Sequence, residues 1–165
     1  MGLVDNSPMR FEHLIEINDP GLEYLLPLTR AQVWAGLIHR VEDARPFLPG
    51  LETCEITSRG AGWVERRLDF GAVQLVDRAT WETGQSVCFY TTPGANHRGG
   101  QLCITIEEPA INHLFLRFVY QTEAAAALVD DDAPYEEFLR QAYEAADMDT
   151  VKVIRLMAQA AGAAT

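Results

Sequence analysis

An arginine lies in the middle of the apolar side of a predicted strand, and a nearby aspartate can pair with it. The stretch WVERRLDFG at 63–71 alternates in polarity, and Arg66 shares its side with valine, leucine and phenylalanine. Gly71 and Ala72 predict a two-residue type II′ turn, which places Arg66 opposite Asp77 on the next strand. A guanidinium beside a carboxylate on an apolar surface can orient the polar end of a bound molecule.

The same register brings opposite charges together on both faces of this strand pair. Glu65 falls opposite Arg78 on one face, and Leu68 falls opposite Leu75 on the other. A slip of one residue would separate the charged pairs and reverse the faces. Two interpretations of Arg66 stay open: a solvated pair near the rim of the sheet, or a polar spot inside an apolar pocket.

Acid–base chemistry has four further candidates. His13 lies on the apolar side of a strand predicted at 9–18, where it could move a proton or simply be hydrogen-bonded in the core. Tyr90, Tyr120 and Tyr143 could each direct a hydroxyl into a cavity, although buried tyrosines commonly have a structural partner.

Motifs for other chemistries are absent from the sequence. No serine lies in G-x-S-x-G, and the four histidines lack the spacing of metal ligands, so neither a nucleophile nor a metal site is expected. The glycine-rich stretch at 94–100 lacks the lysine of a phosphate loop and predicts a long hairpin loop, which could lie at a pocket mouth. No cofactor is expected.

Composition narrows the class of partner. The 165 residues suit one domain at 1–165, and 48% hydrophobic residues allow a substantial core. A net charge of −11 argues against nucleic acid and against anionic membrane surfaces. No apolar run is long enough for membrane insertion.

Three cysteines, Cys54, Cys88 and Cys103, form no C-x-x-C pair. We therefore expect free thiols and a cytoplasmic location. Cys88 is expected on the inner side of the sheet beside Tyr90, as a small apolar side chain.

The elements that must position these residues follow from periodicity and turn chemistry. A strand at 9–18 is followed by a helix that begins after Thr29, where Gln32 completes a capping box. Pro46 and Pro49 predict a kink or a second short helical piece. The next six predicted strands are separated by turns too short for crossover helices, so the sheet should be antiparallel. These strands are expected at 51–58, 62–70, 72–82, 86–92, 100–108 and 113–123.

A long helix is predicted at 134–161. Its apolar stripe includes Phe138, Tyr143 and Met157, and its acidic residues are interpreted as a solvated face. Small residues in the stripe allow either a cavity against the sheet or close packing.

This order of elements resembles the helix-grip fold of the START-like (SRPBCC) superfamily, an α+β fold in which a seven-stranded curved antiparallel sheet wraps a long C-terminal helix. The segments TRAQVWAGLIHRVEDARPFLPGLETCEI, RRLDFGAVQLVDRATWE and FLRFVYQ are similar to its AtaL-like branch. The resemblance covers nearly the whole chain. It implies a cavity beneath the long helix that takes a small hydrophobic or amphipathic molecule such as a lipid.

Three functions compete. The first is a binder or carrier of such a molecule. The second is an enzyme similar to polyketide cyclases or aromatases, in which Arg66 would hold an enolate oxygen oriented by Asp77 while His13 or a tyrosine moves protons. The third is an interaction module, with Trp63 and the 94–100 loop at a partner surface or a homodimer interface. Candidate ligand-binding residues are Arg66, Asp77, Leu68, Phe70, Leu75, Leu116, Phe118, Tyr120, Tyr143, Tyr90 and His13.

Overall fold

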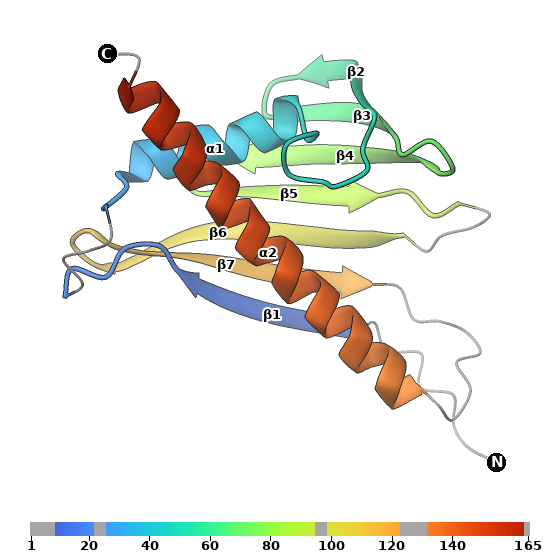
Figure 1. Cartoon of the computed structure of the whole chain (residues 1–165). Coiled ribbons are helices and arrows are strands. Elements are labelled where there is room, and N and C mark those ends of the chain that lie inside the picture. Colours follow the sequence, from blue (N-terminus) through green and yellow to red (C-terminus); the bar gives the residue numbers. More distant parts are fainter. Residues whose placement is uncertain (1–8, 22–25, 95–98, 123–131, 164–165) are drawn as a thin grey trace.

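A seven-stranded antiparallel sheet forms the body of the chain (Figure 1). The computed structural model describes residues 9–21, 26–94, 99–122 and 132–163. The strands lie in the order β1-β7-β6-β5-β4-β3-β2, which confirms the predicted sheet. Their bounds are β1 Met9–Glu16, β2 Thr53–Gly60, β3 Trp63–Asp69, β4 Gln74–Glu82, β5 Ser86–Thr91, β6 Gly100–Ala110 and β7 His113–Thr122.

The β3–β4 hairpin has the predicted register. Arg66 pairs with Asp77 across the two strands, and Leu68 pairs with Leu75. Gly71 has a φ of +87°, a left-handed conformation that glycine adopts without steric cost. The turn closes with a hydrogen bond of 2.9 Å from the Phe70 amide to the carbonyl of Val73. Two-residue turns of this kind match the twist of the strands and fix their register.

Helix α1, Arg30–Glu42, begins with the predicted capping box. The Thr29 hydroxyl accepts from the amide of Gln32 at 3.1 Å, and the Gln32 side chain accepts from the amide of Thr29 at 2.8 Å. After Glu42 the predicted second helical piece is reduced to hydrogen-bonded turns, in which the amide of Phe47 donates to the carbonyl of Ala44 at 2.9 Å. Prolines on both sides of Phe47 explain why no regular helix continues.

Helix α2, Asp132–Ala163, crosses the sheet obliquely, with its C-terminal half beside α1 (Figure 1). Its buried face consists of Asp147, Thr150, Val151 and Ile154. The predicted stripe is confirmed at Thr150, which is buried, and at Tyr143 and Met157, which pack against the core, but it is wrong at Phe138, which is 66% exposed. An oblique crossing buries only the part of a helix that lies over the sheet or against α1, so an apolar residue beyond that contact stays in solvent. Within the described residues no helix is long and apolar enough to cross a membrane.

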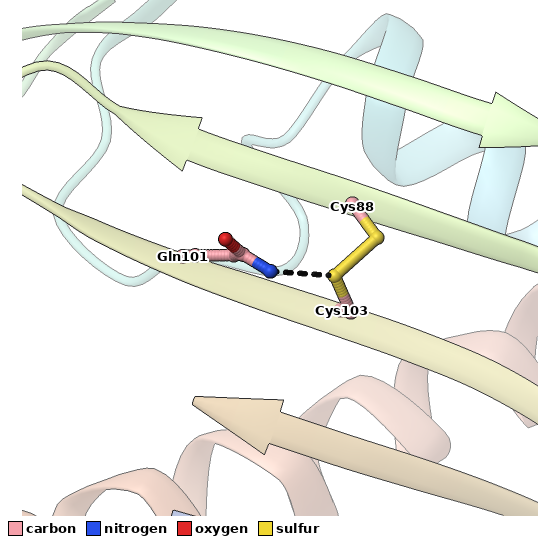
Figure 2. The surroundings of a disulfide bond; sticks show 3 residues. All are labelled: Cys88, Gln101 and Cys103. Atoms are coloured by element: carbon pink, nitrogen blue, oxygen red, sulfur yellow. Dashed lines mark hydrogen bonds between the residues drawn. A yellow bond between two sulfur atoms is a disulfide. The ribbon is translucent and has the colours of Figure 1, made fainter. Parts of the chain in front are cut away.

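The outer face of the sheet carries a disulfide between Cys88 on β5 and Cys103 on β6 (Figure 2). The two residues lie directly opposite each other in the strand pair, and the Gln101 side chain donates to the sulfur of Cys103 at 3.4 Å. Both parts of the prediction for Cys88 are wrong: it is paired, and it faces outward. Strand alternation gives the reason, because the buried Val87 and Phe89 occupy the inner face of β5.

Cys54 is a free thiol, as predicted. Of the predicted loop at 94–100, residues 95–98 lie outside the described part of the chain.

Candidate ligand cavity

A cavity of about 700 Å³ lies between the inner face of the sheet and the two helices. Apolar side chains supply most of the wall, and a few polar groups supply the rest. The wall consists of Arg40, Leu48, Arg66, Leu68, Phe70, Leu75, Asp77, Phe89, Thr91, Gly99, Gly100, Gln101, Leu102, Tyr120, Thr122, Leu139 and Tyr143. A concave apolar space with a few convergent polar groups is the usual form of a small-molecule site.

The structure brings together seven of the eleven residues that the sequence nominated. Those that line the cavity are Arg66, Asp77, Leu68, Phe70, Leu75, Tyr120 and Tyr143. Leu116 and Phe118 are fully buried on β7 and belong to the packed core. Tyr90 is 39% exposed on the outer face, for the same reason of alternation that places Cys88 there. His13 borders a separate small hollow.

Arg66 and Asp77 form a buried, two-pronged ion pair. Arg66 Nε donates to Asp77 Oδ1 at 2.8 Å and Nη2 donates to Oδ2 at 2.6 Å, with both residues under 5% exposed. The pair is therefore not solvated at a rim. Nη1 donates to the carbonyls of Arg40 at 2.9 Å and Val41 at 3.1 Å, which lie in the last turn of α1. Those carbonyls have no partner within the helix, so Arg66 ties the end of α1 to the sheet.

Arg40 is a second buried guanidinium, and sequence reasoning missed it. It is 7% exposed, and its Nη1 donates to the Thr150 hydroxyl of α2 at 2.8 Å. The guanidinium carbons of Arg40 and Arg66 lie 5.2 and 5.0 Å from the centre of the Phe89 ring. Burial lowers the pKa of Arg40 and the Arg66 charge also lowers it, whereas Tyr120, Asp147 and Asp77 act to raise it.

Asp147 is a buried carboxyl on α2 with two side-chain partners. The Tyr120 hydroxyl donates to Oδ1, and His13 Nδ1 lies 3.2 Å from Oδ2. Burial raises the pKa of Asp147 to about 6, an effect that outweighs its hydrogen bonds. Burial also raises the pKa of Tyr120, and the neighbouring Asp147 raises it further.

A smaller hollow of about 120 Å³ lies on the other side of these groups. Its wall includes His13 and Asp147, and Tyr120 and Tyr143 border both spaces. The two tyrosine rings stack with their centres 4.0 Å apart and 9° between their planes. Tyr120, Asp147 and His13 thus form a continuous line of polar groups from the main cavity to the smaller hollow.

The missed residues had a signal in the sequence. Arg40 follows the buried Val33 and Leu37 at intervals of seven and three, and therefore falls on the apolar stripe of α1. Asp147 lies four residues after Tyr143 and three before Thr150, on the stripe of α2. A charged residue at a stripe position indicates a buried polar site, whereas the acids of α2 were all interpreted as solvated.

Among the described residues, one group of side chains outside the cavity has metal-ligating atoms close together. The ligand atoms of Glu16, Asp19 and His113 lie within 4.8 Å of one another. His113 Nε2 contacts Glu16 Oε2 at 2.8 Å, and Glu16 is exposed. Exposed acidic groups commonly lie together without a metal ion, so this contact is read as a hydrogen bond between His113 and Glu16.

Comparison with known proteins identifies the family. The family described as "AtaL: Acetylaranotin biosynthesis cluster protein L" matches residues 15–161. The chain belongs to this family. Among curated protein sequences, none matches this chain.

Solved structures show the same fold at low identity. The Zhui aromatase/cyclase from Streptomyces sp. R1128 has a TM-score of 0.59 and 17% identity, covering 92% of this chain and 94% of its own. Ara h 8.0201 has a TM-score of 0.61 and 10% identity, covering 89% and 97%. Human STARD10 has a TM-score of 0.61 and 9% identity, covering 91% and 64%. The AtaL-family chain has the helix-grip fold of the START-like (SRPBCC) superfamily.

Proposed function

We propose that this AtaL-family chain, acting as one domain over 1–165, binds a small hydrophobic or amphipathic molecule in the cavity between sheet and α2. The observation that carries the proposal is the cavity itself, about 700 Å³ in volume and lined mainly by apolar side chains. Close packing is the rule for protein interiors, so a space of this size under a long helix calls for an occupant.

The residues of the cavity wall have different roles in the proposed binding. Leu68, Phe70 and Leu75 on the β3–β4 hairpin offer apolar surface to the body of the molecule. Arg40 and Tyr120 offer polar atoms to its head. Arg66 and Asp77 line the same space, but most of their hydrogen-bonding capacity is used within the protein, so they serve to hold the wall in shape.

Filling the cavity tests this function. Leu75→Trp places a large ring at a partly buried position of the wall, whereas Val76→Trp places the same ring on the outer face of the same strand, where Val76 is 50% exposed. Binding of the neutral fluorescent probe N-phenyl-1-naphthylamine should weaken at least about tenfold in Leu75→Trp and stay unchanged in Val76→Trp. Equal binding by both variants, or none by the wild type, contradicts the proposal.

An enzyme similar to polyketide cyclases or aromatases is the second candidate. It is favoured by the Tyr120–Asp147–His13 line, in which Tyr120 lines the cavity with Arg40 and Asp147 accepts its hydrogen bond from behind the wall. In this function Tyr120 would donate a hydrogen bond to a substrate carbonyl, with Asp147 behind it. Cyclisation of a poly-β-keto thioester should be lost in Tyr120→Phe and kept in Tyr90→Phe, which changes an outer-face tyrosine. Activity that survives Tyr120→Phe excludes this role.

A homodimer stays a prediction. Trp63 is partly buried, and the guanidinium of Arg78 lies 4.5 Å from the centre of its ring. This contact covers part of the surface that a partner would use. Multi-angle light scattering of purified protein measures the oligomeric state, and a strict monomer across concentration contradicts the dimer.

A cytoplasmic location also stays a prediction. The Cys88–Cys103 disulfide favours an oxidising compartment instead, because cytosolic proteins rarely keep disulfides. Treatment of intact cells with N-ethylmaleimide, followed by mass spectrometry of peptides, distinguishes the two. Alkylation of both cysteines supports the cytoplasm, and recovery of the linked peptides contradicts it.

A further inference from the structure

We propose that the cavity selects molecules that carry a carboxylate, and that Arg40 binds this group through its guanidinium. The inference rests on the proposed function, because it names the chemical class of head group that the same cavity takes. It concerns a residue of α1 that lies outside the Arg66–Asp77 pair nominated from the sequence.

Arg66 has little capacity left for a ligand. Its four hydrogen bonds to Asp77 and to the carbonyls of Arg40 and Val41 use four of the five N–H groups of a guanidinium. Its charge is balanced by Asp77, which lies in the same buried pair. A ligand anion would therefore compete with a carboxylate that is already held by two hydrogen bonds.

Arg40 differs from Arg66 in both respects. Among the described residues its side chain donates one hydrogen bond, from Nη1 to the neutral hydroxyl of Thr150. Within the same residues no buried side-chain nitrogen or oxygen lacks a partner, and Arg40 lines the cavity. We infer that its remaining N–H groups are available to a ligand there. These groups have the planar fork that matches the two oxygens of a carboxylate.

The charges around Arg40 favour an anion. Asp77 is paired with Arg66, and the two oxygens of Asp147 face Tyr120 and His13. The charged side chains of the described wall are Arg40, Arg66 and Asp77, and Asp147 lies behind Tyr120. Both carboxylates attract the Arg40 charge, but neither is hydrogen-bonded to it among the described residues. Burying a charge without a hydrogen-bonded counter-charge is costly, and burial lowers the pKa of Arg40 although Tyr120, Asp147 and Asp77 act to raise it. A ligand carboxylate would remove that cost.

The surroundings also give the head group a direction. The Phe89 ring lies against both guanidiniums and forms an apolar surface beside Arg40. Leu48, Leu68 and Leu75 line the same cavity and can contact the body of the molecule. The arrangement suits a flat aromatic or polyene acid, with its oxygens on Arg40 and its carbon skeleton against the leucines.

Calorimetric titration with two matched probes tests the inference. 2-Naphthoate and 2-naphthamide share a ring system, but only the first is an anion. We expect wild-type protein to bind 2-naphthoate at least about tenfold more tightly than 2-naphthamide, as a charge-assisted pair of hydrogen bonds would give. Arg40→Gln should remove this preference by weakening 2-naphthoate alone. Arg67→Gln, which removes an exposed arginine from the outer face of β3, should keep it.

A second measurement needs no substitution of Arg40. In wild-type protein, 2-naphthoate should shift the side-chain Nε–H resonance of Arg40 in an NMR spectrum, and 2-naphthamide should leave it in place. Equal affinity for the two probes, a preference that survives Arg40→Gln, or an unmoved Arg40 resonance overturns the assignment. Failure of N-phenyl-1-naphthylamine to bind wild-type protein instead contradicts the proposed function itself, so the two failures can be told apart.

Discussion

Two arginines in one cavity differ in what remains of their hydrogen-bonding capacity. Arg66 donates to an aspartate and to two helix carbonyls, whereas Arg40 donates to one hydroxyl among the described residues. The first side chain therefore holds α1 against the sheet, and the second lines the cavity with fewer hydrogen bonds to the protein. An arginine in a cavity wall can bind a ligand only through N–H groups that are not already hydrogen-bonded within the protein.

The β3–β4 hairpin has one buried ion pair, Arg66–Asp77, and one exposed pair, Arg78–Glu65. Breaking the buried pair should lower the free energy of unfolding much more than breaking the exposed pair. Asp77→Asn leaves Arg66 buried and incompletely paired, so the free energy of unfolding should fall by about 3 kcal/mol. Glu65→Gln removes the partner of Arg78 on the outer face, where both side chains are nearly half exposed, and should cost less than about 1 kcal/mol. Urea denaturation monitored by circular dichroism measures both. Similar losses for the two variants would contradict the burial of the Arg66–Asp77 pair.

Asp147 predicts a dependence of stability on pH. Its pKa of about 6 in the folded protein lies above the ordinary value near 4, so the folded state binds the proton more tightly than the unfolded state. Its contribution to stability is therefore fully present below about pH 4 and is lost as pH rises through about 6. Asp147→Asn should remove this decline, whereas Asp149→Asn, an exposed change on the same helix, should not.

Urea denaturation of the three proteins between about pH 4 and pH 7 gives the comparison. His13, Tyr120 and Arg40, which act on the pKa of Asp147, are present in all three proteins, so a difference between the profiles reports on Asp147. A wild-type profile that parallels that of Asp147→Asn throughout this range contradicts the assignment to Asp147.

The strand pairing of Arg66 could be predicted because local facts decide it. A turn glycine and two charged cross-strand pairs agree on one register, and a slip would break all three. Arg40 and Asp147 could not be placed in the same way. Their partners, Thr150, Tyr120 and His13, belong to other elements, so the contacts depend on how each helix docks.

At the scale of elements, Gly36 sets how closely α1 approaches α2. A Cβ at this position would lie 2.6 Å from Cγ1 of Ile154, closer than side-chain atoms pack. Gly36→Ala should therefore destabilise the protein by about 1–3 kcal/mol, although alanine is the better helix former. A double-mutant cycle with Ile154→Ala, measured by thermal unfolding, should show that the two changes together cost less than their sum. Stabilisation by Gly36→Ala alone contradicts the close approach.

The disulfide between β5 and β6 gives a second prediction at this scale. Its cysteines are 15 residues apart. Closing a loop of that size lowers the conformational entropy of the unfolded chain, which raises the free energy of unfolding by up to about 3 kcal/mol. In urea denaturation, the free energy of unfolding of the double variant Cys88→Ser, Cys103→Ser should be lower than that of the wild type by up to this amount. Addition of a reductant should lower the free energy of unfolding of the wild type to the same extent. Cys54→Ser, at the free cysteine, serves as the control. A midpoint that does not respond to reductant would mean that the bond is absent in solution.

Helix existence was easier to predict than helix docking. The capping box at Thr29 located the start of α1, because a cap depends on residues three positions apart. The predicted stripe of α2 includes the buried Thr150, but it also includes the exposed Phe138 and omits the buried Val151 and Ile154. An oblique crossing decides which turns are covered, and that angle is a property of the packed molecule.

At the scale of the whole molecule, the fold could be predicted because the connections between consecutive strands are short. Six consecutive strands joined by short turns can form only an antiparallel sheet, and a long amphipathic helix must cover one face of it. The cavity was not decidable from sequence, since its volume is the difference between the space under α2 and the side chains that enter it. Known structures with 9–17% identity share the fold, so chemistry must be sought in the wall of each cavity.

Native mass spectrometry of protein purified without detergent tests the central claim, that α2 and the sheet enclose a site for a small amphipathic molecule. We expect a noncovalent adduct of a few hundred daltons on wild-type protein and on Val76→Trp, released by gentle collisional activation and missing from Leu75→Trp. An adduct that Leu75→Trp retains, or a wild-type chain that carries none and takes up no added 2-naphthoate or N-phenyl-1-naphthylamine, would contradict it.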